Sequence, residues 1–342
     1  MVSPRRLYGM ENTFMWKYVV KRILLMIPTM LIVTALVFLL INITPVEPAR
    51  IILGTDVAEE QVEALNRELG FYDPLPVRYF NWLKNAVQGD FGNSYYTNRS
   101  VTEEIMSRFP YTLKLSLLSL GVSILVGIPL GVFCATKQYS IGDHILSVLS
   151  MGLGAIPIFW LGLLLLLEFS SKLGWFPAGG VKRGGWLAWV LPTITLALGN
   201  TASYLRYTRS VMLDSIRQDY IRTARAKGCS EAAVTWKHAF RNSTLTLITI
   251  TGTTLSALMG GAIVVEQVFT IPGLGVMIVT AIQRKDIPEV MGALVFLAMF
   301  FLIMMLIVDL LYAVVDPRLK GRFITGAKKK KTARQGKAAQ NG

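Results

Sequence analysis

The sequence alternates long, uncharged apolar stretches with shorter segments that carry nearly all of its charged residues. Six of these stretches are 19 to 23 residues long. A helix rises about 1.5 Å per residue, so about 20 residues cross the hydrocarbon core of a bilayer. Backbone polar groups in lipid must pair within their own segment, which selects helices. We therefore predict an all-α membrane protein with six transmembrane helices: Ile23–Ile41, Leu115–Ala135, Ile145–Leu167, Trp186–Leu205, Ser243–Val265 and Val290–Val308.

The overall composition agrees with a membrane protein, since 53% of the residues are hydrophobic and only 16% are charged. Soluble domains usually carry about a quarter charged residues. Six charge-free stretches of this length disfavour the alternative, a large soluble protein with buried helices. The fourth stretch contains Pro192, Gly199 and Asn200, so we expect it to pack inside the bundle rather than against lipid. The first stretch is too long for a signal peptide and is interpreted as a retained helix.

Basic residues divide unequally between the two sets of loops. The segments that share a side with the termini hold 23 Lys and Arg residues, and the opposite segments hold 11. The positive-inside rule therefore predicts that both termini are cytoplasmic. We expect residues 1–22 to form a cytoplasmic N-terminus, residues 23–316 the membrane domain, and residues 317–342 a basic, disordered cytoplasmic tail attracted to lipid. Because the basic residues adjoin membrane spans, we predict no nucleic-acid partner.

Residues 42–112 form a long segment that this topology places outside the cell. Helical spacing of apolar residues predicts short helices over Ala58–Leu69 and Val77–Val87, separated by a proline-containing break and followed by a turn at Gly89–Gly92. Aromatic residues of the second helix suit a membrane surface. The segment is either a docking surface and gate or a small cap over the bundle.

The cytoplasmic loop 206–242 contains another predicted helix, over Asp214–Lys227, with Gly228 placed to cap its C-terminal end. One face of this helix carries Ile216, Tyr220, Thr223, Ala224 and Lys227. A short, basic, partly apolar helix suits a groove on a partner protein. Contact with anionic lipid is an equally good interpretation of the residues alone.

The fifth predicted span has small residues at regular spacing, among them Thr249, Gly252, Ser256 and Gly260. Such residues either allow close helix packing or leave room along a passage. Glu266 follows this span directly, where we expect water to reach it. Acidic residues are absent from the middle of all six spans, which disfavours an ion-coupled carrier. The two histidines and two cysteines are scattered, so we predict no metal site and no disulfide.

Several motifs in order resemble the B-type permease subunits of dipeptide and oligopeptide ABC importers, and the resemblance covers nearly the whole chain apart from the termini. The matching segments are Gly89–Ser94, Phe109–Leu113, Ile156–Trp160, Asp219–Gly228 and Val265–Gly275. This resemblance implies a type I ABC importer permease fold in a cell inner membrane. It also implies that a permease helix inserts into a groove of an ATPase. The implied coupling residues are Asp219, Tyr220, Thr223, Ala224, Arg225, Ala226, Lys227 and Gly228.

The same resemblance implies partners: a second permease subunit, two ATPase domains that use ATP and Mg²⁺, and an extracytoplasmic binding protein. The chain itself has no phosphate-binding loop of the Gly-x-x-x-x-Gly-Lys type and is expected to be no enzyme. Peptides are the expected cargo, with oligosaccharides or nickel complexes as alternatives and an autonomous channel or ion-coupled carrier as a remote one. The expected translocation path comprises Thr249, Gly252, Ser256 and Gly260. The expected external gate or docking site comprises Glu266, Pro272, Gly273 and Gly275.

Overall fold

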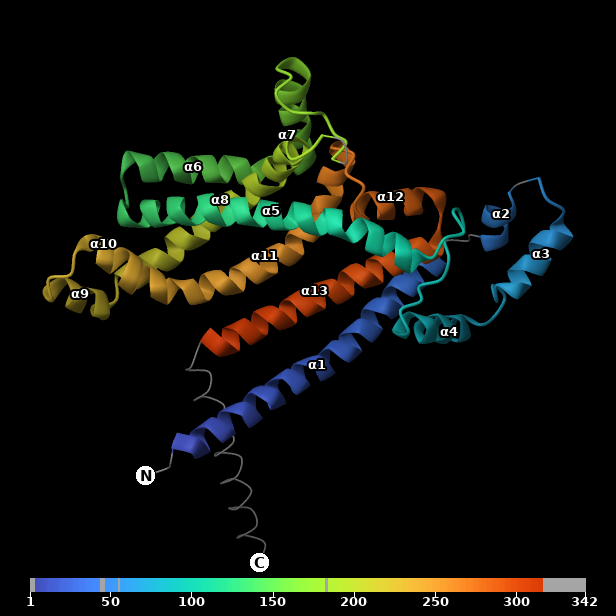
Figure 1. Cartoon of the computed structure of the whole chain (residues 1–342), viewed down its shortest axis with the longest axis horizontal. Helices are drawn as coiled ribbons and strands as arrows, with labels where there is room; N and C mark the ends of the chain where they lie inside the picture. The colour runs from blue at the N-terminus through green and yellow to red at the C-terminus, as the bar shows by residue number, and fades with distance from the viewer. Residues whose placement is uncertain (1–3, 44–46, 55, 182–183, 316–342) are drawn as a thin grey trace, which may run out of the picture.

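The computed structural model describes residues 4–43, 47–54, 56–181 and 184–315. Helices joined by turns make up these ranges, and the pairing of extended backbone within them is limited to an isolated bridge between Asn93 and Ser100. The all-α prediction is therefore confirmed for the described part (Figure 1). The predicted tail, 317–342, lies outside the described residues.

Five long helices form the frame of the molecule, and each contains one predicted span or most of one. They are α1 (Pro4–Asn42), α5 (Val101–Thr136), α8 (Val190–Ile216), α11 (Arg241–Val268) and α13 (Ile287–Val315). Figure 1 shows α1 and α13 side by side, with α5, α8 and α11 packed beyond them. Four of these helices extend beyond their apolar stretch at both ends, because polar residues continue the helix. The fifth, α8, begins only at Val190, since residues 187–189 of its predicted span form the 3₁₀-helix η2 (Leu187–Trp189).

The third predicted span is not one helix, and that prediction is wrong. Its residues form α6 (Ile141–Ala155) and α7 (Ile158–Leu165), which continues into the π-helix η1 (Leu166–Lys172). The two halves meet at 101°, as Figure 1 shows. Pro157 has no N–H and disfavours helical geometry at the residue before it, and Ile156 is extended, with ψ 126°. Pro157 therefore breaks the apolar stretch into two helices, although hydropathy alone treats the stretch as continuous.

The described helices do not confirm the predicted count of six spans. Four segments are long and apolar enough to cross a membrane, and the bent pair α6–α7 would make five. The four segments are Val19–Asn42, Val101–Thr136, Thr246–Val268 and Ile287–Leu310. The fourth predicted span, within α8, falls short of that hydropathy because it carries polar residues, yet most of its length is buried between other helices. This agrees with the expectation that it packs inside the bundle.

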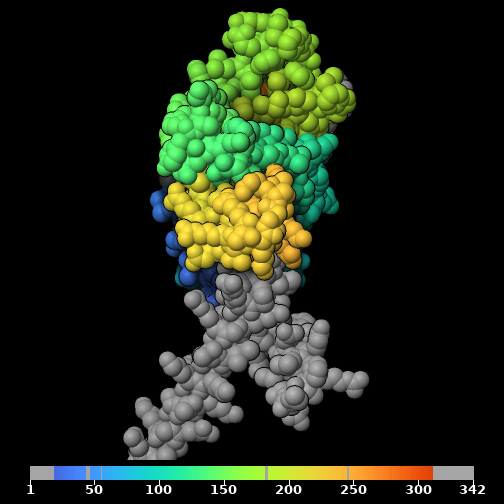
Figure 2. Space-filling view, turned by 90° about the vertical axis from the view of Figure 1, so that its left-hand side faces the viewer, coloured from blue at the N-terminus to red at the C-terminus, as the bar shows by residue number. Residues whose placement is uncertain are grey.

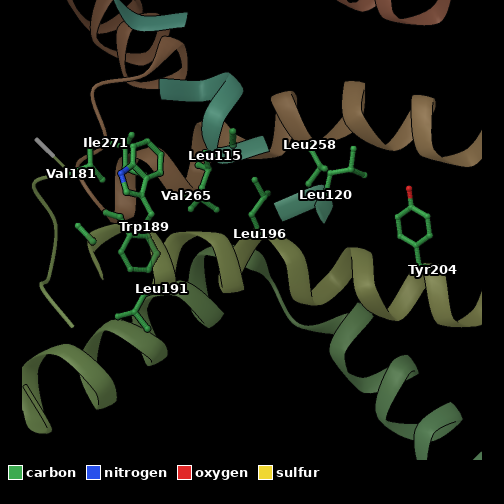
Figure 3. Packing of buried hydrophobic residues seen from close by; sticks show 13 residues of the cluster. Leu115, Leu120, Val181, Trp189, Leu191, Leu196, Tyr204, Leu258, Val265 and Ile271 are labelled. Atoms are coloured by element: carbon green, nitrogen blue, oxygen red, sulfur yellow. The ribbon is translucent and has the colours of Figure 1, made fainter. Parts of the chain in front are cut away.

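The main apolar core lies between α5, α8 and α11 (Figure 3). Leu115 and Leu120 of α5 meet Leu196 of α8 and Leu258 of α11 there. Two glycines of α5 allow the helix to approach α8 closely: a Cβ on Gly127 would lie 2.6 Å from Cβ of Tyr204, and Gly131 meets Thr208 in the same way. Small residues at four-residue spacing commonly serve this purpose in membranes.

The segment between α1 and α5 folds into three short helices, α2 (Pro48–Leu53), α3 (Glu59–Glu68) and α4 (Leu75–Val87). The two predicted helices are confirmed with small shifts at their ends. The predicted turn is also confirmed, because Gly89 and Gly92 have positive φ angles of 84° and 86°. An additional helix, α12 (Leu274–Arg284), follows α11 and was not predicted.

The predicted helix Asp214–Lys227 is divided in the structure. Its first residues belong to α8, which ends at Ile216, and the remainder forms α9 (Asp219–Ala226) after extended Gln218. Gly228 has φ +79°, as expected of the glycine that follows a helix. A single turn, α10 (Glu231–Ala233), and a π-helix (Val234–Phe240) then lead into α11. Figure 2 shows α9 and α10 in yellow on one end of the molecule, which we call the α9 end.

Candidate functional site

The α9 helix is anchored by two side chains. Ile221 is fully buried and Ala224 nearly so, and both join an apolar cluster with Val132 and Ala135 of α5 and Met212 of α8. The cluster fixes this short helix against the cytoplasm-predicted ends of two long helices. The α9 helix therefore packs directly against α5 and α8.

Hydrogen bonds add to this anchoring. The Tyr220 hydroxyl lies 2.6 Å from Ser215 Oγ, which in turn donates to the carbonyl of Ala239 at 3.0 Å. Arg225 donates from Nε and Nη2 to the two oxygens of Glu231, at 2.8 and 3.1 Å. The Arg225 guanidinium lowers the pKa of Glu231, which keeps that carboxylate charged. The turn after α9 is thus tied back to α9 itself.

The outward surface of α9 carries most of the residues expected to couple. Of the predicted set only Ala224 is buried. The exposed members are Asp219, Tyr220, Thr223, Arg225, Ala226, Lys227 and Gly228. Of the face predicted from helical spacing, Tyr220, Thr223 and Lys227 are exposed, whereas Ala224 is buried beside Ile221. The prediction treated Asp214–Lys227 as one helix. Since α9 starts separately at Asp219, the orientation of its faces does not follow from that of α8.

A partly buried ion pair joins α6 to α8, close to the end of the bundle that carries α9. Arg209 of α8 donates from Nε and Nη2 to Asp143 of α6, at 2.7 and 2.8 Å. Asp143 is 2% exposed and also accepts from the backbone N–H of Tyr139 at 3.0 Å. Paired charges of this kind are strong and directional. The α9 end therefore behaves as one packed unit of α5, α6, α8 and α9.

At the opposite end, Glu266 is the centre of a buried hydrogen-bond cluster. Its carboxylate accepts from Thr112 Oγ1 at 2.5 Å and from the backbone N–H groups of Gly275 and Val276 at 2.7 and 3.2 Å. The N–H of Leu274 donates to Thr112 Oγ1 at 2.8 Å. The first N–H groups of α12 thus hold the carboxylate, as helix N-termini commonly hold anions. Three elements, α5, α11 and α12, meet at this point.

The glycines predicted with Glu266 have a steric reason to be glycine. A Cβ on Gly273 would overlap the Glu266 carboxylate, and one on Gly275 would lie 2.8 Å from Glu266 Oε2. Pro272 precedes them in the connection to α12. The expectation that water reaches Glu266 is wrong, because the residue is fully buried. The α12 helix folds over the end of α11 and covers it, which sequence alone did not indicate.

The four small residues predicted to line a path occupy different surroundings on α11. A Cβ on Gly252 would overlap Val308 of α13, so this glycine serves helix packing. Ser256 is 8% exposed and donates to the carbonyl of Gly252. Thr249 is half-buried, and Gly260 is exposed. The predicted path is therefore divided between a packed side and an open side of one helix.

The open side of α11 lacks large apolar residues over Thr246–Val268. Its exposed residues are Thr246, Thr253, Ala257, Gly260 and Gln267. By contrast, α1 exposes leucine and isoleucine from Ile23 to Leu40, as lipid contact favours. A face of small and polar residues suits water or another helix better than hydrocarbon.

Thr112, Asp143 and Arg209 were absent from the predicted site residues. Thr112 lies in Phe109–Leu113, a segment that resembles the family, but the resemblance assigned no role to this residue. Asp143 and Arg209 are 66 positions apart. A single sequence does not show that the two residues form an ion pair, since each is a charged residue next to a predicted span. Within the described ranges no three His, Cys, Asp or Glu residues gather as a metal site would require.

Comparisons with known proteins agree over most of the chain. Residues 127–321 match the family described as binding-protein-dependent transport system inner membrane component, and residues 15–116 match the N-terminal part of such membrane components. The oligopeptide transport system permease protein AppB of Bacillus subtilis (strain 168) is 41% identical over 89% of this chain and 99% of its own. The glutathione transport system permease protein GsiC of Escherichia coli (strain K12) is 38% identical over 90% of this chain and 99% of its own.

Among solved structures, an inward-facing conformation of the MetNI methionine ABC transporter has a TM-score of 0.52 and 19% identity. The structural match covers 62% of this chain and 96% of the MetNI chain. That likeness supports the fold of an ABC importer permease. The family matches and the relatives near 40% identity go further, because they extend over almost the full length. The chain therefore belongs to the family of binding-protein-dependent transport system inner membrane components.

Proposed function

We propose that this chain is a permease subunit of an ATP-driven, binding-protein-dependent importer of di- and oligopeptides. The observation that carries this proposal is the similarity, at 38–41% identity over about nine-tenths of the chain, to permeases of oligopeptide and glutathione systems. Those names favour peptides over oligosaccharides or nickel complexes as cargo. An autonomous channel or ion-coupled carrier has no support among these relatives.

The family implies that ATP and Mg²⁺ are used by separate ATPase subunits and that a binding protein delivers the cargo. We further propose that the permease partner is a second, related chain rather than a second copy of this one. The open face of α11 would line the path or meet that partner, because its exposed residues are small or polar. Gly260 and Thr253 are the proposed path residues on this face, with half-buried Thr249 at its edge and with Gly252 and Ser256 supporting it from the packed side.

The α9 helix is the proposed contact with an ATPase subunit. Its buried side, Ile221 and Ala224, holds it to the bundle, while the residues expected to couple lie outward. Closure of the ATPases would then move α9 together with α5 and α8. A ligand can shift such an equilibrium only by its different affinity for the two states, so the ATPases must hold α9 differently in each state.

This assignment places the α9 end, and with it both chain termini, in the cytoplasm. The Glu266 cluster and the segment α2–α4 would then lie on the outer side. We propose that Glu266, Gly273 and Gly275 keep α12 closed over the outer end of α11, with Pro272 in its hinge. The excess of Lys and Arg on the proposed inner side supports this orientation.

A bulky substitution on the exposed side of α9 tests the coupling role. In a complete assembly reconstituted with its ATPases and binding protein, Ala226→Trp should lower ATP-driven peptide uptake by about tenfold or more, because the enlarged side chain blocks docking in a groove. Ala226→Ser, which keeps a small side chain at the same exposed position, is the matched control and should keep normal uptake. Full coupled uptake by the Ala226→Trp assembly would contradict the proposal.

A further inference from the structure

A cleft of about 620 Å³ opens where the segment α2–α4 meets the ends of α1 and α13. Its walls come from α1, α3, α4, the turn over 90–98 and the first residues of α13. Ligand sites for small molecules commonly have volumes of about 300–1,000 Å³. None of the residues expected to couple or to line a path lies in this cleft.

Side-chain amides are concentrated in the cleft. Five of the ten asparagines in the sequence line it: Asn42, Asn81, Asn85, Asn93 and Asn98. Asn42 donates to the carbonyl of Phe38, but within the described part of the chain the other four side chains have no hydrogen-bond partner. The indole N–H of Trp82, another lining residue, is buried and also lacks a partner there. An amide side chain both donates and accepts, as a peptide main chain does.

Charged groups of both signs face the same cleft without ion pairs. Arg78 lies 5.1 Å from the centre of the Phe71 ring and forms no ion pair with any described carboxylate. Glu68, Asp73 and Asp90 of the lining likewise have no described cationic partner. Neighbouring arginines of the same segment, in contrast, are paired: Arg67 donates to Glu63 at 2.6 Å. Unpaired charges of both signs therefore line the cleft.

The wall formed by the turn is held firmly in place. Ser94 Oγ donates to Asp286 Oδ2 at 2.5 Å, and the N–H of Tyr96 donates to the same oxygen at 3.3 Å. Asp286 is fully buried, and the Arg284 guanidinium lies 4.1 Å from the centre of the Tyr96 ring. A wall fixed in advance lowers the entropic cost of binding a ligand.

We propose that this cleft is a binding site for a short peptide with free termini. Arg78 receives the terminal carboxylate, the acidic residues attract the ammonium group, and the asparagine amides pair with the main chain. This inference rests on the proposed function and adds to it a cargo site on the permease itself. A short free peptide fits better than a loop of the binding protein, because a loop has no termini to match these unpaired charges.

Direct binding to the complete assembly in lipid nanodiscs, without the binding protein, tests the site. Radiolabelled trialanine should bind saturably, and N-acetyl-trialanine amide should bind much more weakly. Arg78→Gln should weaken trialanine binding by about tenfold or more, since a charge-assisted pair is lost. Arg78→Lys should retain most of the affinity, because it keeps the charge, and Arg67→Gln, on the same segment but outside the cleft, should bind normally.

The outcomes separate this inference from the proposed function. Absence of saturable binding, equal binding of the blocked peptide, or unchanged binding by Arg78→Gln would overturn the peptide site. An Arg78→Gln assembly that loses capture of the binding protein yet binds trialanine normally would show a protein dock and would overturn it too. ATP-driven uptake is measured on the same preparation: wild-type uptake without trialanine binding contradicts only the cleft, whereas failure of wild-type uptake contradicts the proposed function.

Discussion

Thr112 and Glu266 are 154 positions apart and share one hydrogen bond inside the molecule. Thr112 also accepts from the N–H of Leu274, so a single hydroxyl joins α5 to both partners. A buried carboxylate without donors would be costly, and the cluster supplies three. At the scale of single residues, this cluster joins α12 to α5 and α11 by hydrogen bonds.

Removal of that hydroxyl should be measurable in stability. Thr112→Val keeps the side-chain shape but leaves Glu266 with one donor fewer and the Leu274 N–H without its acceptor. We expect a loss of about 1–3 kcal/mol in the free energy of unfolding. Thermal unfolding of the purified protein in detergent measures the loss, and Thr112→Ser, which retains the hydroxyl, should stay near wild type. Equal melting temperatures for the valine and serine variants would contradict the role given to the hydroxyl.

Gly275 offers a second test of the same cluster, by size rather than by polarity. An added methyl group would press on Glu266 Oε2 and on the backbone of α11 at Ile263. Gly275→Ala should therefore destabilise the protein by about 1–3 kcal/mol, the usual cost of overpacking. Gly121→Ala is the control, because a Cβ on that helical glycine meets open space. The control should be neutral or slightly stabilising in the same thermal assay; a similar loss for both variants would show that the packing around Gly275 is not special.

The sequence identified Glu266, Gly273 and Gly275 as a set through a motif, but it could not show that Glu266 is buried. The burial of Glu266 depends on α12, a short helix whose position over α11 could not be inferred from the sequence. The asparagines of the cleft pose the same difficulty. They come from α1, α4 and the turn 90–98, and only the fold brings them together.

At the scale of elements, hydropathy located the long helices well because an uncharged stretch of about 20 residues has few alternatives in lipid. Hydropathy did not predict the places where the backbone conformation interrupts a helix. Pro157 breaks the third stretch into α6 and α7, and extended Gln218 separates α9 from α8. The existence of α9 and its glycine cap were predictable from the local pattern, whereas its buried face depended on contacts with α5 and α8.

The ion pair between α6 and α8 is testable as a connection between elements. Asp143→Asn and Arg209→Gln should each destabilise the protein by about 1–3 kcal/mol, since each leaves a buried polar partner incompletely paired. Because the two residues share the interaction, the double variant should lose much less than the sum of the single losses. Chemical or thermal unfolding of the four proteins in detergent gives this double-mutant cycle. Strictly additive losses would show that the two side chains do not depend on one another.

At the scale of the whole molecule, two ends with different characters are joined by the bundle. The α9 end carries an anchored helix with an exposed basic surface, and the other end carries the Glu266 cluster and the asparagine-lined cleft. The main core between α5, α8 and α11 connects them. The proposed importer requires the first end to face the ATPases inside the cell and the second to face the binding protein outside.

The side of the membrane on which α9 lies tests this account most directly. A background with Cys134→Ala and Cys229→Ser removes the native thiols, and Arg222→Cys or Glu60→Cys then places one thiol on exposed α9 or α3. Intact cells are treated with a membrane-impermeant maleimide before and after permeabilisation. The account predicts labelling at position 60 in intact cells and at position 222 only after permeabilisation. Labelling of position 222 in intact cells would contradict it.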